Sequence, residues 1–303
     1  MYFPRPYPDE PTLSLLIRAA RHLGYPMTRL LREMLHADLR GASFALPFSV
    51  IYTSRLTKIP SNDLMRRHTF FPYVTAHFSS ERTAATFELI VEDPSLGRAH
   101  FNFLGGSKRN RLHMRFCTRC VTEDIQQFGE AYWHRKHVLP GVFICTVHDL
   151  PLLTTAIPIG KLGSQNCDFL PSDTPGNAVK LQSNRGLLRE IAVASEELLE
   201  GRRCSVEALI ERYQQLLELF GGDPRHPRRA DHPVYAALKS FYGDAYLTGT
   251  NFVWTRGHTL IHSRARNALL LSPAFGFTAH KHILLNIFLD HLLAVQKMPA
   301  SNA

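Results

Sequence analysis

The sequence predicts a mainly α-helical protein that is interrupted near its middle by one small cysteine-containing module. Apolar residues recur at the three- and four-residue spacing of amphipathic helices along most of the 303 residues. Two helix–turn–helix patterns lie near the N-terminus, and two close pairs of cysteine and histidine lie between positions 117 and 148. We expect four parts: a helix-turn-helix-like part at 1–104, the module at 105–170, a helical pair at 178–222 and a helical C-terminal region at 230–303.

The N-terminal part begins with a predicted pair of short helices. Residues 10–35 carry apolar side chains at helical spacing, and Gly24-Tyr25-Pro26 interrupts that spacing. Glycine and proline are the residues that most often end helices and form turns. The pattern therefore predicts two amphipathic helices joined by a turn.

A second helical pair is predicted at residues 48–56 and 61–68, on either side of Lys58-Ile59-Pro60. Ser61 is the predicted cap of the later helix, because a serine hydroxyl can accept a hydrogen bond from the first-turn amides. We expect a loop through Phe71-Pro72 and then a further helix at residues 81–90.

Two interpretations of this second pair remain open. A DNA-binding helix-turn-helix would place Arg66 and Arg67 in a groove of the duplex. An ordinary helical corner would have the same pattern, since this geometry is common in proteins that never contact DNA.

The cysteine module contains Cys117-Thr118-Arg119-Cys120 and, after 24 intervening residues, Cys145-Thr146-Val147-His148. Two intervening residues let a tight turn direct both side chains of a pair at one ion, and three thiolates with one imidazole complete a tetrahedron. We therefore predict a zinc-finger or zinc-ribbon module that holds one structural zinc ion. Buried thiols without a metal are the alternative, and His134 and His137 are competing donors.

A structural role for the metal follows from its closed set of four ligands, because catalytic zinc keeps an open position. Carboxylates lie near the module at Glu123, Asp124 and Glu130, but their spacing does not match a two-metal site. We therefore expect no catalytic residues and no enzymatic activity.

The chain is basic, with a net charge of +9. Such a charge suits a polyanionic partner, which it attracts over long distances. Exposed cations with no partner are the alternative for each basic cluster. The candidate contacts to double-stranded DNA are Arg66, Arg67, Lys108, Arg109, Arg111, Arg115, Arg225, Arg228, Arg229, Arg256, Arg264 and Arg266.

Apolar residues at helical spacing predict two helices, at residues 187–199 and 206–220, that pack antiparallel. Ser205 is the predicted cap of the second helix. Three further helices are predicted at residues 234–242, 252–268 and 280–293. His258 and His262 lie four residues apart, but the glutamate that a metalloprotease needs after the first histidine is missing.

No apolar run reaches the roughly 18 residues that span a bilayer, and residues 1–6 lack the layout of a signal peptide. These features favour a cytoplasmic protein with no membrane partner. The basic charge adds the expectation of a DNA-associated location.

Several segments of the chain together form a distinctive set. They are Phe3-Pro4-Arg5-Pro6-Tyr7-Pro8-Asp9-Glu10, His68-Thr69-Phe70-Phe71-Pro72, Phe116-Cys117-Thr118-Arg119-Cys120, Phe128-Gly129-Glu130-Ala131-Tyr132-Trp133, His137, Leu139-Pro140-Gly141 and Cys145-Thr146-Val147-His148. This set resembles the TniQ/TnsD family of transposon target-site selection proteins, and the TnsD branch in particular. The resemblance is strongest before residue 155 and weaker at Phe241-Tyr242-Gly243 and at residues 280–285.

The resemblance implies a non-catalytic adaptor that recognises a target in duplex DNA and recruits an AAA+ ATPase transposition regulator of the TnsC type. The alternative within the family is a subunit that bridges a CRISPR guide-RNA effector complex to that regulator. The family also implies that Cys117, Cys120, Cys145 and His148 are the zinc ligands. By the same resemblance the N-terminal segment contacts the ATPase, with Tyr2, Phe3, Arg5 and Tyr7 as candidates.

The chain departs from the family in two respects. Some relatives carry a second cysteine-rich knuckle, whereas only Cys167 lies between the module and residue 200 here, so we expect one zinc ion. TnsD-type selectors are commonly much longer, which implies a short member or part of a longer protein. Homodimerisation is left open by the sequence.

Overall fold

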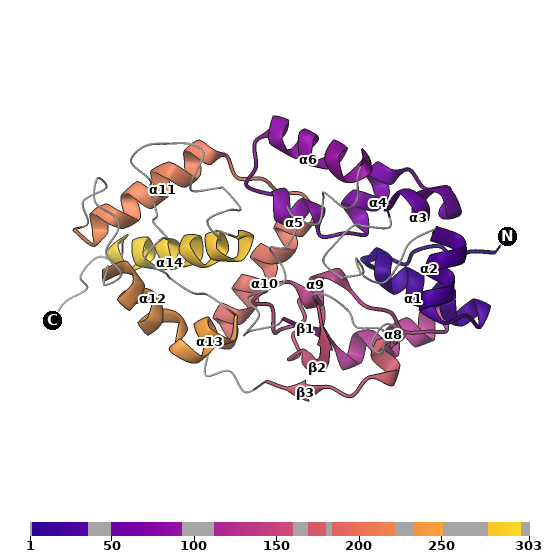
Figure 1. The fold of residues 1–303 in the computed structure, drawn as a ribbon. Helices are drawn as coiled ribbons and strands as arrows, with labels where there is room; N and C mark the ends of the chain where they lie inside the picture. Colours follow the sequence, from indigo (N-terminus) through magenta and orange to yellow (C-terminus); the bar gives the residue numbers. More distant parts are fainter. Residues whose placement is uncertain are drawn as a thin grey trace.

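The computed structural model describes residues 2–35, 50–92, 112–159, 169–179, 184–221, 233–250 and 278–297. Within these ranges the protein is mainly helical with one small sheet, so the predicted fold class is confirmed. Figure 1 shows the N-terminal helices at one end of the molecule, the C-terminal helices at the other, and the sheet between them.

The N-terminal helices follow the predicted pattern closely. Gly24 ends the first helix with a φ of 64°, in the left-handed conformation that glycine adopts without a steric cost. The turn at Lys58-Ile59-Pro60 separates the second pair, as predicted. The helices are α1 (Thr12–Leu23), α2 (Met27–Leu35), α3 (Val50–Thr57), α4 (Ser61–Arg67), α5 (Phe71–Thr75) and α6 (Ser80–Glu92).

Two local predictions in this part are wrong. Ser61 is the first residue of α4 rather than its cap, and Pro60 occupies the cap position without a side-chain hydrogen bond. Phe71-Pro72 begins the helix α5 rather than a loop. Proline is well tolerated in the first turn of a helix, where its missing N–H would have no intrahelical partner.

The middle of the chain forms an antiparallel sheet of order β1-β2-β3, with two helices between β1 and β2. Arg115 of β1 pairs with Thr154 of β2, and the register shifts between His113 and Arg115. The elements are β1 (His113–Phe116), α8 (Thr118–Phe128), α9 (Arg135–Val138), β2 (Leu153–Pro158) and β3 (Asn177–Ala178). A single 3-10 turn, Pro171–Asp173, precedes β3.

The C-terminal part is helical, as predicted. Ser205 caps α11, because its Oγ accepts a hydrogen bond from the Ala208 amide at 3.0 Å. α13 follows directly after Gly243 and was not predicted, and the expected helix at residues 252–268, with His258 and His262, lies outside the described residues. The helices are α10 (Arg185–Leu199), α11 (Val206–Leu219), α12 (Pro233–Tyr242), α13 (Asp244–Gly249) and α14 (Ala279–Lys297).

α10 connects the two ends of the molecule. It packs on α5 and α9 on one side and on α14 on the other, and it lies centrally in Figure 1. α11 packs on α14, so α14 is a shared neighbour of the two helices that were predicted as a pair. One hydrophobic core contains residues from all four predicted parts, from Leu13 to Leu289. A second, smaller cluster contains Val50, Leu64, Met65, Phe71 and Ile90. The division of the chain into four parts therefore stays a prediction, because the larger core crosses all of its boundaries.

Gly141 lies where the middle of the chain packs on α13 and α14. Its φ is 77°, and a Cβ there would overlap the His280 ring and lie 2.7 Å from the Tyr246 hydroxyl oxygen. That hydroxyl donates a hydrogen bond to the Gly141 carbonyl at 3.1 Å. Only glycine allows this close approach without a steric cost.

Gly141→Ala is therefore expected to lower the free energy of unfolding by about 2–4 kcal/mol, combining left-handed strain with overpacking. Gly129→Ala is the matched control, because Gly129 also has a positive φ of 82° but nothing lies within 4 Å of its added Cβ. Denaturant unfolding of both variants measures the difference. Equal losses would mean that the contact with α13 and α14 contributes nothing.

None of the helices in the described part of the chain is long and apolar enough to cross a membrane.

Candidate metal centre

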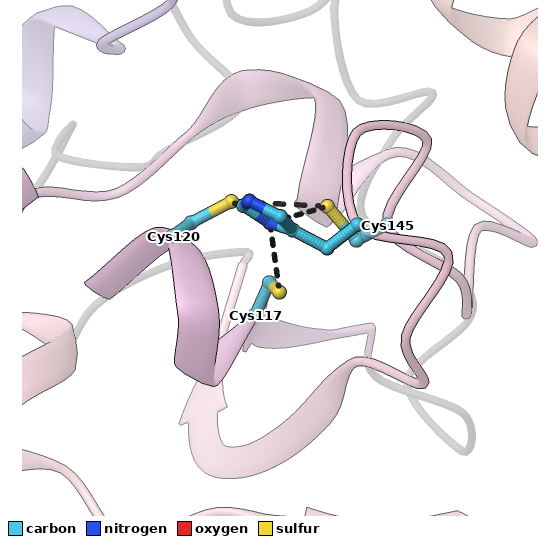
Figure 2. A group of neighbouring side chains, drawn as sticks. Cys117, Cys120 and Cys145 are labelled. Atoms are coloured by element: carbon cyan, nitrogen blue, oxygen red, sulfur yellow. Dashed lines mark hydrogen bonds between the residues drawn. The ribbon is translucent and has the colours of Figure 1, made fainter. Parts of the chain in front are cut away.

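The four predicted ligands come together from two short segments. Cys117 is the cap residue of α8, and Cys120 lies in its first turn, so the helix directs both sulfur atoms to one side. Cys145 and His148 lie on a tight turn in which the Asp149 amide donates to the Cys145 carbonyl at 2.8 Å. Figure 2 shows the sulfur atoms of Cys117, Cys120 and Cys145 directed toward a common centre.

The donor atoms of these residues all lie within 4.8 Å of one another. His148 Nδ1 lies 3.6 Å from Cys117 Sγ, 3.3 Å from Cys120 Sγ and 3.7 Å from Cys145 Sγ. The sulfur atoms of Cys120 and Cys145 are 3.7 Å apart.

These separations fit a tetrahedral zinc site. With Zn–S bonds of about 2.3 Å and Zn–N bonds of about 2.0 Å, the edges of a zinc tetrahedron are roughly 3.5–3.8 Å long. Three of the four distances agree with that range, and the fourth is slightly shorter. The four residues are thus able to hold a metal ion, and zinc is the ion that three thiolates and one imidazole favour.

The thiols interact strongly with one another. Hydrogen bonds from Cys120 and Cys145 lower the pKa of Cys117 to about 3, and the same contacts raise the pKa of Cys120. Cys117 is therefore readily ionised, whereas Cys120 keeps its proton. A divalent cation would compensate most of the negative charge of three thiolates, which explains why metal binding to such sites releases protons.

The competing histidines have other partners. His134 Nε2 lies 2.9 Å from Asp124 Oδ2. His137 is buried, and its Nε2 lies 3.8 Å from Cys120 Sγ on the interior side of the group. Neither histidine belongs to the set of four donors.

The candidate partner-binding residues differ in accessibility. Tyr2 is 58% exposed and Arg5 is also exposed, whereas Phe3 and Tyr7 are half-buried. Tyr7 stacks on Phe128 with ring centroids 4.3 Å apart. Of the four, Tyr2 and Arg5 are thus the most accessible to another molecule.

The candidate DNA-binding cations that the structure describes fall into two groups. Arg66 and Arg67 are exposed near the end of α4. Arg115 is 2% exposed, and it donates to the carbonyl oxygens of His137 at 3.1 Å and Leu139 at 2.6 Å. The DNA contact predicted for Arg115 is therefore wrong, because its guanidinium is used inside the protein. The remaining candidates lie outside the described residues: Lys108, Arg109, Arg111, Arg225, Arg228, Arg229, Arg256, Arg264 and Arg266.

Sequence reasoning missed a buried polar network that joins α1 to the metal module. Arg18 donates to Glu10 at 2.7 Å and to Glu130 at 2.8 Å, and both Arg18 and Glu10 are fully buried. Ser14 donates to Glu10 and accepts from the Trp133 amide at 3.1 Å. The four-residue spacing of Glu10, Ser14 and Arg18 was the available signal, because in the helix that the sequence predicts from residue 10 it would place three polar groups on one face.

Comparison with known proteins assigns the chain to a family. A sequence model of the TniQ family matches residues 1–152, which include the polar network and all four candidate ligands. The protein therefore belongs to the TniQ family. It is 26% identical over 153 residues to the transposon Tn7 transposition protein TnsD of Escherichia coli. This match covers 48% of the present chain and 30% of TnsD.

Proposed function

We propose that this protein selects target sites for transposition, as a non-catalytic adaptor that binds duplex DNA and recruits an AAA+ ATPase regulator of the TnsC type. The observation that carries the proposal is the family match over residues 1–152, where the similar Escherichia coli protein is itself a transposition protein. The metal centre supports it, because four protein ligands leave a bound zinc ion no open position for a substrate.

The α3–α4 pair is the proposed DNA-binding surface among the described residues. Its two helices are separated by three residues, and its later helix ends in exposed Arg66 and Arg67. Arginine contacts to phosphate bind DNA of any sequence, whereas contacts to base edges provide discrimination. The net charge of +9 favours association with a polyanion.

Arg66→Ala combined with Arg67→Ala is expected to weaken binding to duplex DNA and to reduce the slope of log K against log salt by about one for each lost phosphate contact. Arg189→Ala is the control, because Arg189 is an exposed arginine on α10, a different part of the surface. Binding to labelled duplexes across a salt series measures both quantities. An unchanged slope in the double variant would assign the α3–α4 pair to the helical-corner interpretation.

The same measurement tests target selection when genomic duplexes are compared with random sequence. A large ratio of the two affinities supports an adaptor that reads DNA directly. Weak and indiscriminate binding favours the alternative function, in which a CRISPR guide-RNA effector complex supplies the target and this protein bridges it to the regulator.

The proposed surface for the ATPase regulator is the N-terminal segment around Tyr2 and Arg5. Both residues are exposed, and the buried Pro4 between them anchors the backbone. An exposed aromatic ring and an arginine are the residue types most enriched at protein interfaces. Binding of purified regulator to the immobilised full chain tests this part of the proposal.

A further inference from the structure

The metal centre has a second layer of side chains that are not ligands. We propose that Glu123 and His137 are positioning residues for the metal, Glu123 by orienting the ring of His148 and His137 by donating a hydrogen bond to the sulfur of Cys120. The inference concerns the metal centre and goes beyond the proposed function in transposition.

Glu123 acts on the solvent side of the site. Its Oε2 lies 2.9 Å from His148 Nε2, while His148 Nδ1 faces the three sulfur atoms. A carboxylate accepts the Nε2–H, so the lone pair of that ring is left on Nδ1, where a metal needs it. The histidine side chain is 7% exposed, which restricts it to this orientation.

The helix α8 explains why Glu123 can reach this position. Glu123 follows Cys120 by three residues, so both side chains lie on the same face of the helix. Arg119 Nε donates to the other oxygen, Oε1, at 3.3 Å. The helix therefore carries two metal ligands and the carboxylate that orients a third ligand.

His137 acts on the interior side. Its ring is buried, and its Nε2 lies 3.8 Å from Cys120 Sγ. The short helix α9 that carries it is held in place by Arg115, whose Nε donates to the His137 carbonyl at 3.1 Å. Three thiolates and one neutral imidazole give a zinc site a net negative charge, and a buried N–H donor offsets part of it.

Cobalt(II) binding to the metal-free full chain tests both roles, because cobalt reports tetrahedral thiolate coordination by its visible spectrum. Glu123→Ala is expected to weaken Co²⁺ and Zn²⁺ binding by about 10- to 100-fold, the usual effect of losing such a partner. Glu123→Gln keeps an oxygen that can accept the Nε2–H and is expected to retain most of the affinity. Gln126→Ala, at an exposed position of the same helix, is the control.

His137→Phe is expected to move the sulfur-to-cobalt charge-transfer band to longer wavelength, because a thiolate without its hydrogen bond is a better electron donor. His137→Gln places an amide N–H near the same position and is expected to restore the band. Circular dichroism verifies that each variant is folded, and His137→Leu, which also has no hydrogen-bond donor, replaces His137→Phe if the phenylalanine variant does not fold.

Three outcomes would overturn the proposal. Glu123→Ala could bind metal as tightly as Gln126→Ala, or a folded variant without a donor at this position, such as His137→Phe, could show an unchanged band. His137→Phe could instead lose one metal equivalent, which would make His137 a ligand. All three leave the DNA measurements untouched, so failure here is distinguishable from failure of the proposed function.

Discussion

Cys117→Ser and Cys145→Ser are each expected to abolish stoichiometric zinc binding and to unfold the middle of the protein. The sulfur atoms of both residues are buried, and they come from separate segments that the ion would join. Structural zinc in small modules supplies apparent binding free energies of roughly 10–16 kcal/mol, which is most of the stability of such a module. Metal content by elemental analysis and melting by circular dichroism measure the two effects.

Cys204→Ser is the matched control for these variants. Cys204 is a half-buried free cysteine near the start of α11, outside the candidate ligand group. We expect this variant to keep one equivalent of zinc and a nearly unchanged melting temperature. Retention of zinc and of normal melting by Cys117→Ser or Cys145→Ser would refute the ligand assignment.

The second large effect is expected at the buried ion pair between Arg18 and Glu10. Arg18→Met removes the cation but leaves the Glu10 carboxylate with no exposed surface. Breaking a buried pair on one side typically costs about 3–5 kcal/mol, because a buried charge loses its compensation. Urea denaturation of Arg18→Met is expected to show a loss of this size, and the double variant with Glu10→Gln is expected to recover part of it.

The loss should depend on pH. Burial raises the pKa of Glu10 to about 7, and Arg18 acts in the opposite direction. A carboxyl group whose folded-state pKa lies above its unfolded value contributes stability below the unfolded pKa, and that contribution decreases as the pH rises through the folded pKa. Without Arg18 the pKa rises further, so we expect a smaller cost at pH 5 than at pH 8. A cost that is equal at both values would contradict an ionised Glu10 in the wild-type protein.

The cysteine variants and Arg18→Met all change residues within the region that the family match covers, but they destabilise it by different mechanisms. The cysteine variants remove a link between two segments of the metal module, whereas Arg18→Met breaks the connection between α1 and Glu130, which follows α8. Zinc content therefore separates them: Arg18→Met is expected to retain the ion under conditions in which it stays folded.

The helices of the chain were largely predictable because their signals are local. Gly24, Pro60 and Ser205 mark boundaries within a few residues of where the structure has them. α5 was missed because Phe71-Pro72 was interpreted as a loop, although proline also begins helices. α13 was missed because a six-residue helix is too short to establish a periodic pattern.

The candidate ligands were also predictable, since two-residue spacing brings the members of each pair together whatever the rest of the chain does. The helical pattern, the four candidate ligands and the resemblance to the TniQ family all follow from the amino-acid sequence without any knowledge of the fold. The sequence also determined the basic charge, but not which cations are accessible: Arg115 belongs to a basic run in the sequence and yet lies buried against two carbonyl oxygens.

The side chains that surround the ligands, and the contacts that join distant segments, depend on tertiary packing and could not be predicted. Glu130 meets Arg18 across 112 residues, and Glu123 meets His148 across 25 residues. Such contacts depend on how the helices pack, and spacing along the chain carries no information about which distant groups will pair. A buried charge requires a partner, and only the packing of the helices buries Arg18 and places Glu10 and Glu130 beside it.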